Sequence, residues 1–286
     1  MPKPFLKLGL LLGLFLQPGL GFAHHVAAAE SSSGMSPMST SFLLRDGSIR
    51  PASRFFLTQE FRAVDDNLGQ VYTSLLGGEL AVHPRVSLTG EVGLVSFDQN
   101  GGDSETGLGD VTLQPRVLLW NAARSFSYVS SRLSLPTGDE DRGLGQGMVS
   151  QDAIWLIGAK RKGWTGFVAT GLQLGYDSDL DALHVASLGA QSPKFFKKRL
   201  SAGLALSSFT YVDSASFAVG SGKLSLEPGL QVGLDRKKKW LLTLGGRVSL
   251  IDYLRVKNGV TLSTTSHAAL SDALFSATAS LNYFLK

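Results

Sequence analysis

The chain of 286 residues contains no cysteine, and this absence excludes several classes of protein. Without cysteine there is no disulfide scaffold, no thiolate metal site and no thiol nucleophile. Charged residues are also scarce, at 17% of the chain, below the quarter or so that is usual in soluble domains. The excess of 27 basic over 23 acidic residues is small, so we expect no nucleic acid among the partners.

Long hydrophobic runs are missing as well. The longest apolar stretch, residues 8–16, is too short for a transmembrane helix, which needs about eighteen residues or more. Lys3 and Lys7 precede this stretch, and small residues around Ala23 follow it. The pattern is typical of a secretory signal peptide, with cleavage near Ala23 and residues 27–29 as the alternative site.

The chain therefore divides into a signal peptide and two further parts. We expect residues 1–23 to be the signal peptide, residues 24–51 a flexible periplasmic leader, and residues 52–286 one folded domain. The leader is rich in Ala, Ser, Gly and Met and has no periodicity. From residue 52 onwards, segments of about a dozen residues alternate apolar and polar side chains.

The alternation has a period of two, which is the period of a β-strand and not of a helix. In residues 108–120, Val111, Leu113 and Val117 fall on one face while Thr112 and Arg116 fall on the other. The same pattern predicts twelve strands, with ten or fourteen as alternatives: residues 53–63, 70–82, 85–97, 108–120, 125–135, 149–160, 164–176, 182–191, 199–210, 223–235, 239–251 and 273–285.

Length and connections favour a membrane barrel over a soluble sandwich. The predicted strands are longer than average soluble strands and suit a tilted span of about 9–11 residues. Short connections such as residues 83–84 and 160–163 alternate with mostly longer ones such as 98–107, 136–148 and 252–272. The sequence therefore predicts an all-β fold, a single closed antiparallel transmembrane β-barrel in a bacterial outer membrane.

Two sequence blocks resemble a known barrel family. Residues 107–119 read Gly-Leu-Gly-Asp-Val-Thr-Leu-Gln-Pro-Arg-Val-Leu-Leu, and residues 132–139 read Arg-Leu-Ser-Leu-Pro-Thr-Gly-Asp, followed by Gly-Leu-Gly-Gln-Gly at 143–147. Together they resemble the outer-membrane transporters of the MetA-pathway-of-phenol-degradation family, which are distantly similar to fatty-acid transporter barrels. The resemblance implies a barrel that admits small aromatic or hydrophobic compounds, and it brings no set of binding residues.

Charged residues on the polar faces of the strands are the candidate site. In a barrel such residues line the lumen, and their mixed signs imply no strong ion preference. Pro115 and Pro228 lie in the middle of strands, where proline cannot donate a ladder hydrogen bond, so each should mark a bulge or a lateral gap in the wall. The lumen-lining candidates are Glu60, Arg62, Glu79, Glu91, Asp110, Arg116, Arg132, Asp152, Glu227 and Arg247.

Three functions remain open on the sequence alone. The leading one is a passive transporter or channel, not an enzyme, whose partners are outer-membrane lipids, periplasmic chaperones, the barrel-assembly machinery and a small hydrophobic solute. The alternatives are a structural or surface-interaction barrel with a plugged lumen, and a lipid-modifying enzyme built on a serine and a histidine such as His184. We assign no cofactor, catalytic residue or metal site. The acidic loop residues Asp98, Asp103, Glu105, Asp139, Glu140 and Asp141 lack the spacing of a calcium loop.

Overall fold

The computed structural model describes the chain from residue 49 to residue 285, with gaps. The described ranges are 49–63, 70–98, 104–139, 142, 144–145, 147, 149–175, 182–196, 199–212, 219–235, 239–256, 259–263 and 275–285. The predicted signal peptide and most of the predicted leader lie outside them. In the described part of the chain, no helix is long and apolar enough to cross a membrane.

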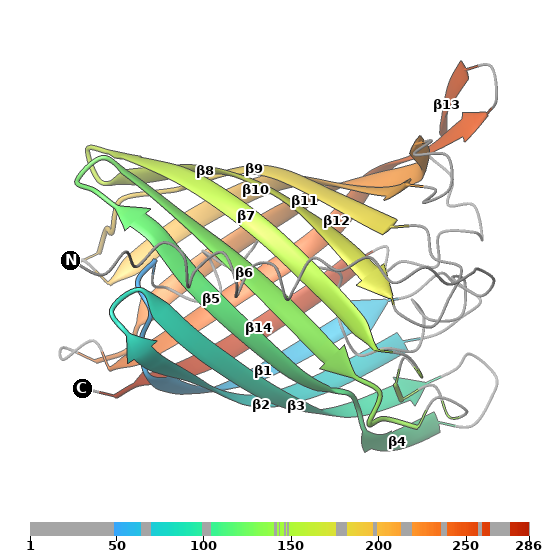
Figure 1. Cartoon of the computed structure of the whole chain (residues 1–286), viewed down its shortest axis with the longest axis horizontal. Coiled ribbons are helices and arrows are strands. Elements are labelled where there is room, and N and C mark those ends of the chain that lie inside the picture. Colours follow the sequence, from blue (N-terminus) through green and yellow to red (C-terminus); the bar gives the residue numbers. More distant parts are fainter. Residues whose placement is uncertain are drawn as a thin grey trace, which may run out of the picture.

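The described residues form strands joined by turns and loops (Figure 1). The elements are β1 (Arg54–Ala63), β2 (Gln70–His83), β3 (Val86–Asp98), β4 (Ser104–Leu108), β5 (Val111–Asn121), β6 (Ser125–Leu135), β7 (Ser150–Arg161), β8 (Trp164–Gly175), β9 (Ala182–Gln191), β10 (Leu200–Val212), β11 (Val219–Gly233), β12 (Trp240–Val256), β13 (Gly259–Ser263) and β14 (Phe275–Phe284).

Twelve long strands pair side by side in one antiparallel sheet that closes on itself. They follow chain order, with β3 beside β5 and β12 beside β14. The ring closes because β1 pairs with both β2 and β14, where Arg54 lies opposite Phe284. A closed sheet leaves no strand edge unpaired. The predicted closed antiparallel barrel of about twelve strands is confirmed.

Two short strands, β4 and β13, lie outside this ring. The sequence predicts loops at residues 98–107 and 252–272. This prediction is wrong where the structure forms β4 and β13 within those ranges. Each takes an edge that a long strand leaves open: β3 pairs with β5 only over Val86–Glu91, so β4 pairs with Leu94–Asp98. A segment of five residues that pairs with a protruding end has too few alternating side chains to be recognised from its period.

The two ends of the barrel differ. At one end, which we call the turn end, turns of two or three residues connect β2 to β3, β5 to β6 and β7 to β8. Connections of eight and six residues join β9 to β10 and β11 to β12 at the same end. The opposite end, which we call the loop end, carries the remaining connections. The start of β1 and the end of β14 both lie at the turn end, where Arg54 is opposite Glu79 and Phe284 (Figure 1).

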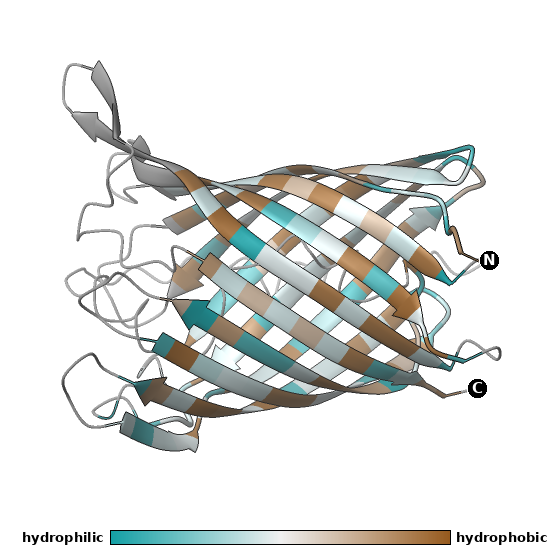
Figure 2. Cartoon of the chain, turned by 180° about the vertical axis from the view of Figure 1, so that it is seen from behind, coloured by the Kyte–Doolittle hydropathy of each residue, from teal (hydrophilic) through white to brown (hydrophobic). Residues whose placement is uncertain are grey.

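Side chains alternate between an inner and an outer wall. In β1, Phe55 and Leu57 are exposed on the outer wall, whereas Phe56, Thr58 and Glu60 are buried on the inner one. Large exposed hydrophobic side chains recur along almost every strand of the ring, and Figure 2 shows apolar residues alternating with polar ones along the strands. This is the apolar outer belt that contact with lipid requires.

Candidate functional site on the inner wall

The charged residues predicted to line the lumen share the buried face of the wall. Eight of them are buried, and Glu91 and Arg132 are half-buried. Glu91 lies directly opposite Gly77 of β2 and Thr112 of β5, and both of these residues are on the buried face. Asp110 lies just before β5 rather than within it. The eight buried residues are Glu60, Arg62, Glu79, Asp110, Arg116, Asp152, Glu227 and Arg247.

The largest ionic cluster joins the first and last strands near the turn end. Glu79 of β2 accepts hydrogen bonds from Nε of Arg54, at 2.9 Å, and from Nη2 of Arg116. Arg54 also donates to Oδ1 of Asn282 in β14, at 2.6 Å. The Glu79 side chain is only 1% exposed. The sequence prediction missed Arg54, although its even number in β1 places it on the face of Glu60.

Three further ion pairs involve six of the other inner-wall charges. Nε of Arg247 lies 3.2 Å from Oε1 of Glu227, and Nε of Arg132 donates to Oδ2 of Asp152 at 2.9 Å. The adjacent Glu60 and Arg62 approach each other to 3.8 Å. Because acids and bases lie beside each other, this part of the wall presents polar groups without a strong field of one sign.

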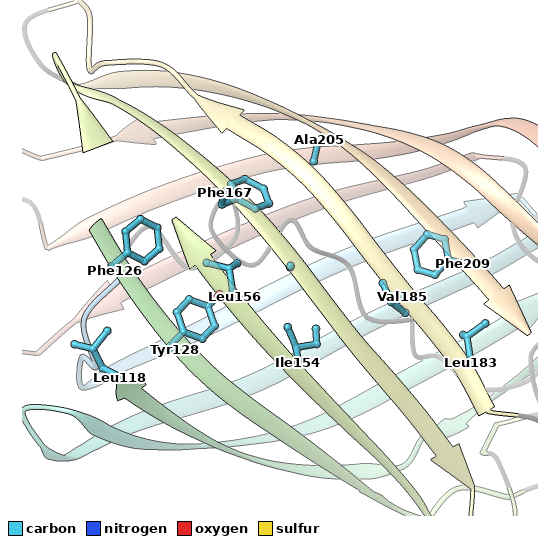
Figure 3. Close-up of a cluster of buried hydrophobic side chains, with 11 residues drawn as sticks. Leu118, Phe126, Tyr128, Ile154, Leu156, Phe167, Leu183, Val185, Ala205 and Phe209 are labelled. Atoms are coloured by element: carbon cyan, nitrogen blue, oxygen red, sulfur yellow. The ribbon is translucent and has the colours of Figure 1, made fainter. Parts of the chain in front are cut away.

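Part of the inner wall of β5–β10 is apolar instead, and we call this surface the apolar strip. The sequence predicted a polar inner wall throughout and missed it. A signal is present in β7, where residues 153–159 are apolar or glycine on both faces, as expected for a strand buried on both sides. The strip, drawn in Figure 3, consists of Leu118, Phe126, Tyr128, Ile154, Leu156, Phe167, Ala169, Leu183, Val185, Ala205 and Phe209.

Phenylalanine rings on the inner wall lie over glycines of the neighbouring strand. Phe126 is directly opposite Gly158, and a Cβ built on Gly158 would meet the ring at 2.1 Å. The pair Phe167 and Gly189 has the same arrangement, with a closest approach of 2.3 Å. Only a residue without a side chain leaves room for such a ring along the wall. The glycines therefore hold the rings against the wall and out of the lumen.

Two segments outside the ring reach this interior. Ile49, five residues before β1, packs against the apolar strip. At the loop end, Leu144 is buried against Val71 and Val95, which face inwards from β2 and β3. Leu144, from the connection between β6 and β7, thus lies in the mouth of the barrel.

The resemblance motifs build the anchor of this loop. The Gly138 N–H donates to Oδ1 of Asp110 at 3.0 Å, and Thr137 Oγ1 accepts from the Val111 N–H at 2.9 Å. A Cβ on Gly145 would meet Asp110 Oδ1 at 2.7 Å and the Gly138 backbone at 2.8 Å. Because Gly138 and Gly145 have no side chain, their backbones can approach each other and Asp110 closely, which explains why the motif contains glycines.

At both prolines the ladder is interrupted on one side and continuous on the other. Pro115 pairs with Leu88 of β3. On its other side, pairing of β5 with β6 stops at Leu113 and resumes at Arg116. Pro228 pairs with Leu204 of β10, but pairing with β12 skips residues 227–228. The register is the same before and after each interruption. The nearby register shifts lie at Leu118–Trp120 and Leu224–Ser225.

The remaining candidates are dispersed. His184 faces outwards, with Nε2 3.0 Å from Thr170 Oγ1, and His83 lies at the end of β2. Glu105 pairs with Arg142, whose pKa this carboxylate raises. Among the described residues, no three acidic or histidine side chains form a metal site. Outside the described residues lie His24, His25, Asp103, Glu140, Asp141 and His267.

This geometry defines a class of protein: an outer-membrane β-barrel with a porin-like channel fold. A sequence model of the family described as "Putative MetA-pathway of phenol degradation" matches residues 53–242. The chain belongs to this family.

The solved structure of another outer-membrane channel shares the fold. The COG4313 outer membrane channel from Pseudomonas putida F1 is 13% identical and covers 88% of this chain and 100% of its own, with a TM-score of 0.58. The NanC porin is 9% identical to this chain. The match covers 81% of this chain and 99% of the porin, with a TM-score of 0.49. Comparison with curated proteins gives no match.

Proposed function

We propose that this barrel is a passive channel for small hydrophobic or aromatic solutes. The observation that carries the proposal is the apolar strip, which runs across six adjacent strands of an inner wall that is otherwise polar. Lumens of water-filled barrels are polar, because ions and sugars must stay hydrated or find hydrogen bonds. An apolar strip offers no such partners, whereas it lowers the cost of desolvating an apolar solute.

The aromatic content of the strip supports an aromatic solute in particular. Phe126, Tyr128, Phe167 and Phe209 contribute four rings to the strip. Each is at most 3% exposed, so a solute makes offset or edge-to-face contacts with these rings only when the groups that cover them move aside. Arg247 lies over the Phe209 ring, 4.7 Å from its centroid, and fixes one border of the strip. The family description, which refers to phenol degradation, agrees with this chemistry.

For the exit of the solute, we propose the interrupted seam between β11 and β12. Beside Pro228, the opposing strand carries Gly246, and the next pair along the ladder is Gly229 opposite Gly245. The seam therefore lacks ladder pairing at residues 227–228, next to three glycines, and the Glu227–Arg247 ion pair crosses it there on the inner wall. The interruption at Pro115 lies instead between the pairs Leu113–Leu133 and Arg116–Ser130, all of which carry side chains. This difference favours the β11–β12 seam as the lateral gap.

A structural barrel with a plugged lumen is the second candidate. The observation in its favour is that the inner-wall ion pairs are almost fully shielded from solvent, and that Leu144 and Ile49 occupy the interior. For the third, a lipid-modifying enzyme, the described strands offer only the outward pair of Thr170 and His184. We assign no catalytic residue to this pair.

Reconstitution into liposomes separates the first two candidates. We expect uptake of phenol or toluene to exceed protein-free leakage by at least tenfold, while ion conductance stays low. The double variant Phe126→Ser and Phe167→Ser should reduce this uptake severalfold. The matched control is the outward Val168→Ser, which leaves the strip intact. Absence of both uptake and conductance would identify the plugged structural barrel instead.

A further inference from the structure

The turn end of the barrel carries a dense set of basic residues. About half of the chain's 27 basic residues lie in or beside the short turns or at the C-terminus. Acidic residues are almost absent there: in the described turns the one acid is Asp235, which accepts the Trp240 N–H at 2.9 Å. The basic residues are Arg85, Arg124, Lys160, Arg161, Lys162, Lys194, Lys197, Lys198, Arg199, Arg236, Lys237, Lys238, Lys239 and Lys286.

Two of these turns are in contact. A Cβ on Gly163, in the β7–β8 turn, would lie 3.1 Å from Cβ of Pro193 in the β9–β10 turn. The contact brings Arg161 and Lys162 to the same corner of the rim as Lys194 and Arg199. All four side chains are exposed. Their positive charges therefore act together on whatever approaches this corner.

The same corner exposes aromatic side chains. Phe196 is 77% exposed, the highest value of any large hydrophobic residue described, and its ring contacts that of Phe195 at 5.7 Å between centroids. Trp164, at the start of β8, is also exposed.

The backbone of the two turns holds these side chains outwards. Lys162 and Phe196 have φ of 49° and 45°, and they are the non-glycine residues with positive φ in the described chain. Such conformations are uncommon for residues with a side chain and concentrate at functional positions. Phe195 and Leu200 close the second turn by hydrogen bonds, with the Phe195 N–H donating to the Leu200 carbonyl at 2.7 Å. These bonds hold the two flanks of the turn together beside the exposed Phe196 ring.

We propose that this corner binds the headgroup of an anionic phospholipid in the periplasmic leaflet. Short turns of outer-membrane barrels face the periplasm, so the corner lies at the level of that leaflet's phosphates. Arginine and lysine side chains bind the phosphate, and aromatic rings contact the adjoining interfacial region. A soluble anion would use the cations alone, and it would give no reason for an exposed Phe196. The site, defined as Arg161, Lys162, Trp164, Lys194, Phe196 and Arg199, is independent of the solute in the lumen.

The test compares lipid retention by two charge-matched variants of the full barrel. Native mass spectrometry of the protein in neutral detergent counts bound phosphatidylglycerol and, in parallel, phosphatidylcholine. We expect phosphatidylglycerol to be retained preferentially. In the variant Arg161→Gln with Arg199→Gln, the affinity of the barrel for phosphatidylglycerol should fall at least tenfold. Each basic residue near an anionic surface raises the binding constant about fivefold. The control Arg85→Gln with Arg124→Gln removes the same charge elsewhere on the rim and should retain lipid within twofold.

A second variant tests the aromatic half of the site. Phe196→Ser keeps every charge and should lower phosphatidylglycerol affinity severalfold while leaving the binding of soluble polyphosphate unchanged. Equal losses in the two arginine variants would show diffuse charge attraction and overturn the site. Equal retention of the two lipids, or a Phe196→Ser variant with unchanged lipid affinity, would also overturn it. Heat-modifiable migration on gels shows in each case that the barrel is folded.

Discussion

The ring of Phe126 occupies the space that a side chain on Gly158 would fill, 2.1 Å from the position of the missing Cβ. The two residues face each other directly across β6 and β7. A wall built in this way gains the apolar surface of the ring without narrowing the lumen by the full width of a phenyl group. The arrangement makes the glycine as important for the shape of the apolar strip as the phenylalanine.

Replacing Gly158 by alanine should therefore turn the Phe126 ring into the lumen. We expect a loss of about 1–3 kcal/mol in the free energy of unfolding, as for other overpacked interiors, together with slower aromatic uptake. Urea titration in liposomes and solute uptake measure the two effects. The control is Gly166→Ala, where the nearest atom to the new Cβ is 3.9 Å away. In a Phe126→Ala background, Gly158→Ala should cost little further stability, and additive losses of the two substitutions would contradict the steric account.

Removing the carboxylate of Glu79 should destabilise the barrel strongly. Glu79→Gln leaves Arg54 and Arg116 buried without their charged partner, and loss of one member of a buried ion pair costs about 3–5 kcal/mol. Glu105→Gln is the matched control, because its pair with Arg142 is solvent-exposed and such pairs contribute about 0–1 kcal/mol. If both variants unfolded at the same urea concentration, burial would not explain the stability that the Glu79 ion pairs provide.

Shortening Leu144 should open the mouth of the barrel. Leu144→Ala removes the side chain that fills the space between Val71 and Val95, so we expect higher single-channel conductance and a stability loss of about 2 kcal/mol or more. Leu108→Ala removes an exposed leucine from nearby β4 and should leave both quantities unchanged. Conductance that does not respond to Leu144→Ala would place the constriction elsewhere.

A disulfide across the β11–β12 seam tests lateral exit. The chain has no cysteine, so Leu226→Cys with Val248→Cys introduces the single possible bridge beside the interruption at Pro228. We expect transfer of a fluorescent hydrophobic solute into the bilayer to stop when the bridge forms and to return on reduction. Leu206→Cys with Leu226→Cys staples the continuous β10–β11 seam and serves as control. Transfer that persists through the oxidised β11–β12 variant would exclude this exit.

The sequence predicted the ring of strands well because period-two alternation is a local property. Strands β1, β5 and β6 begin and end within a few residues of their predicted bounds. The apolar strip could not be predicted in the same way, since Phe167, Val185 and Phe209 come from separate strands and each looks like an ordinary strand residue. The contact of Leu144 with Val71 and Val95 likewise depends on the path of a loop, which no periodicity records.

The hydrogen bond between Arg54 and Asn282 joins residues 228 positions apart in the chain. Until the last strand has been delivered, β1 and β14 each present an open row of backbone donors and acceptors, which is a template for aggregation. Contacts of such high sequence separation also form slowly, because loop-closure entropy opposes them. The nascent chain is therefore most exposed to aggregation late in its synthesis, in the interval between the completion of β14 and its pairing with β1.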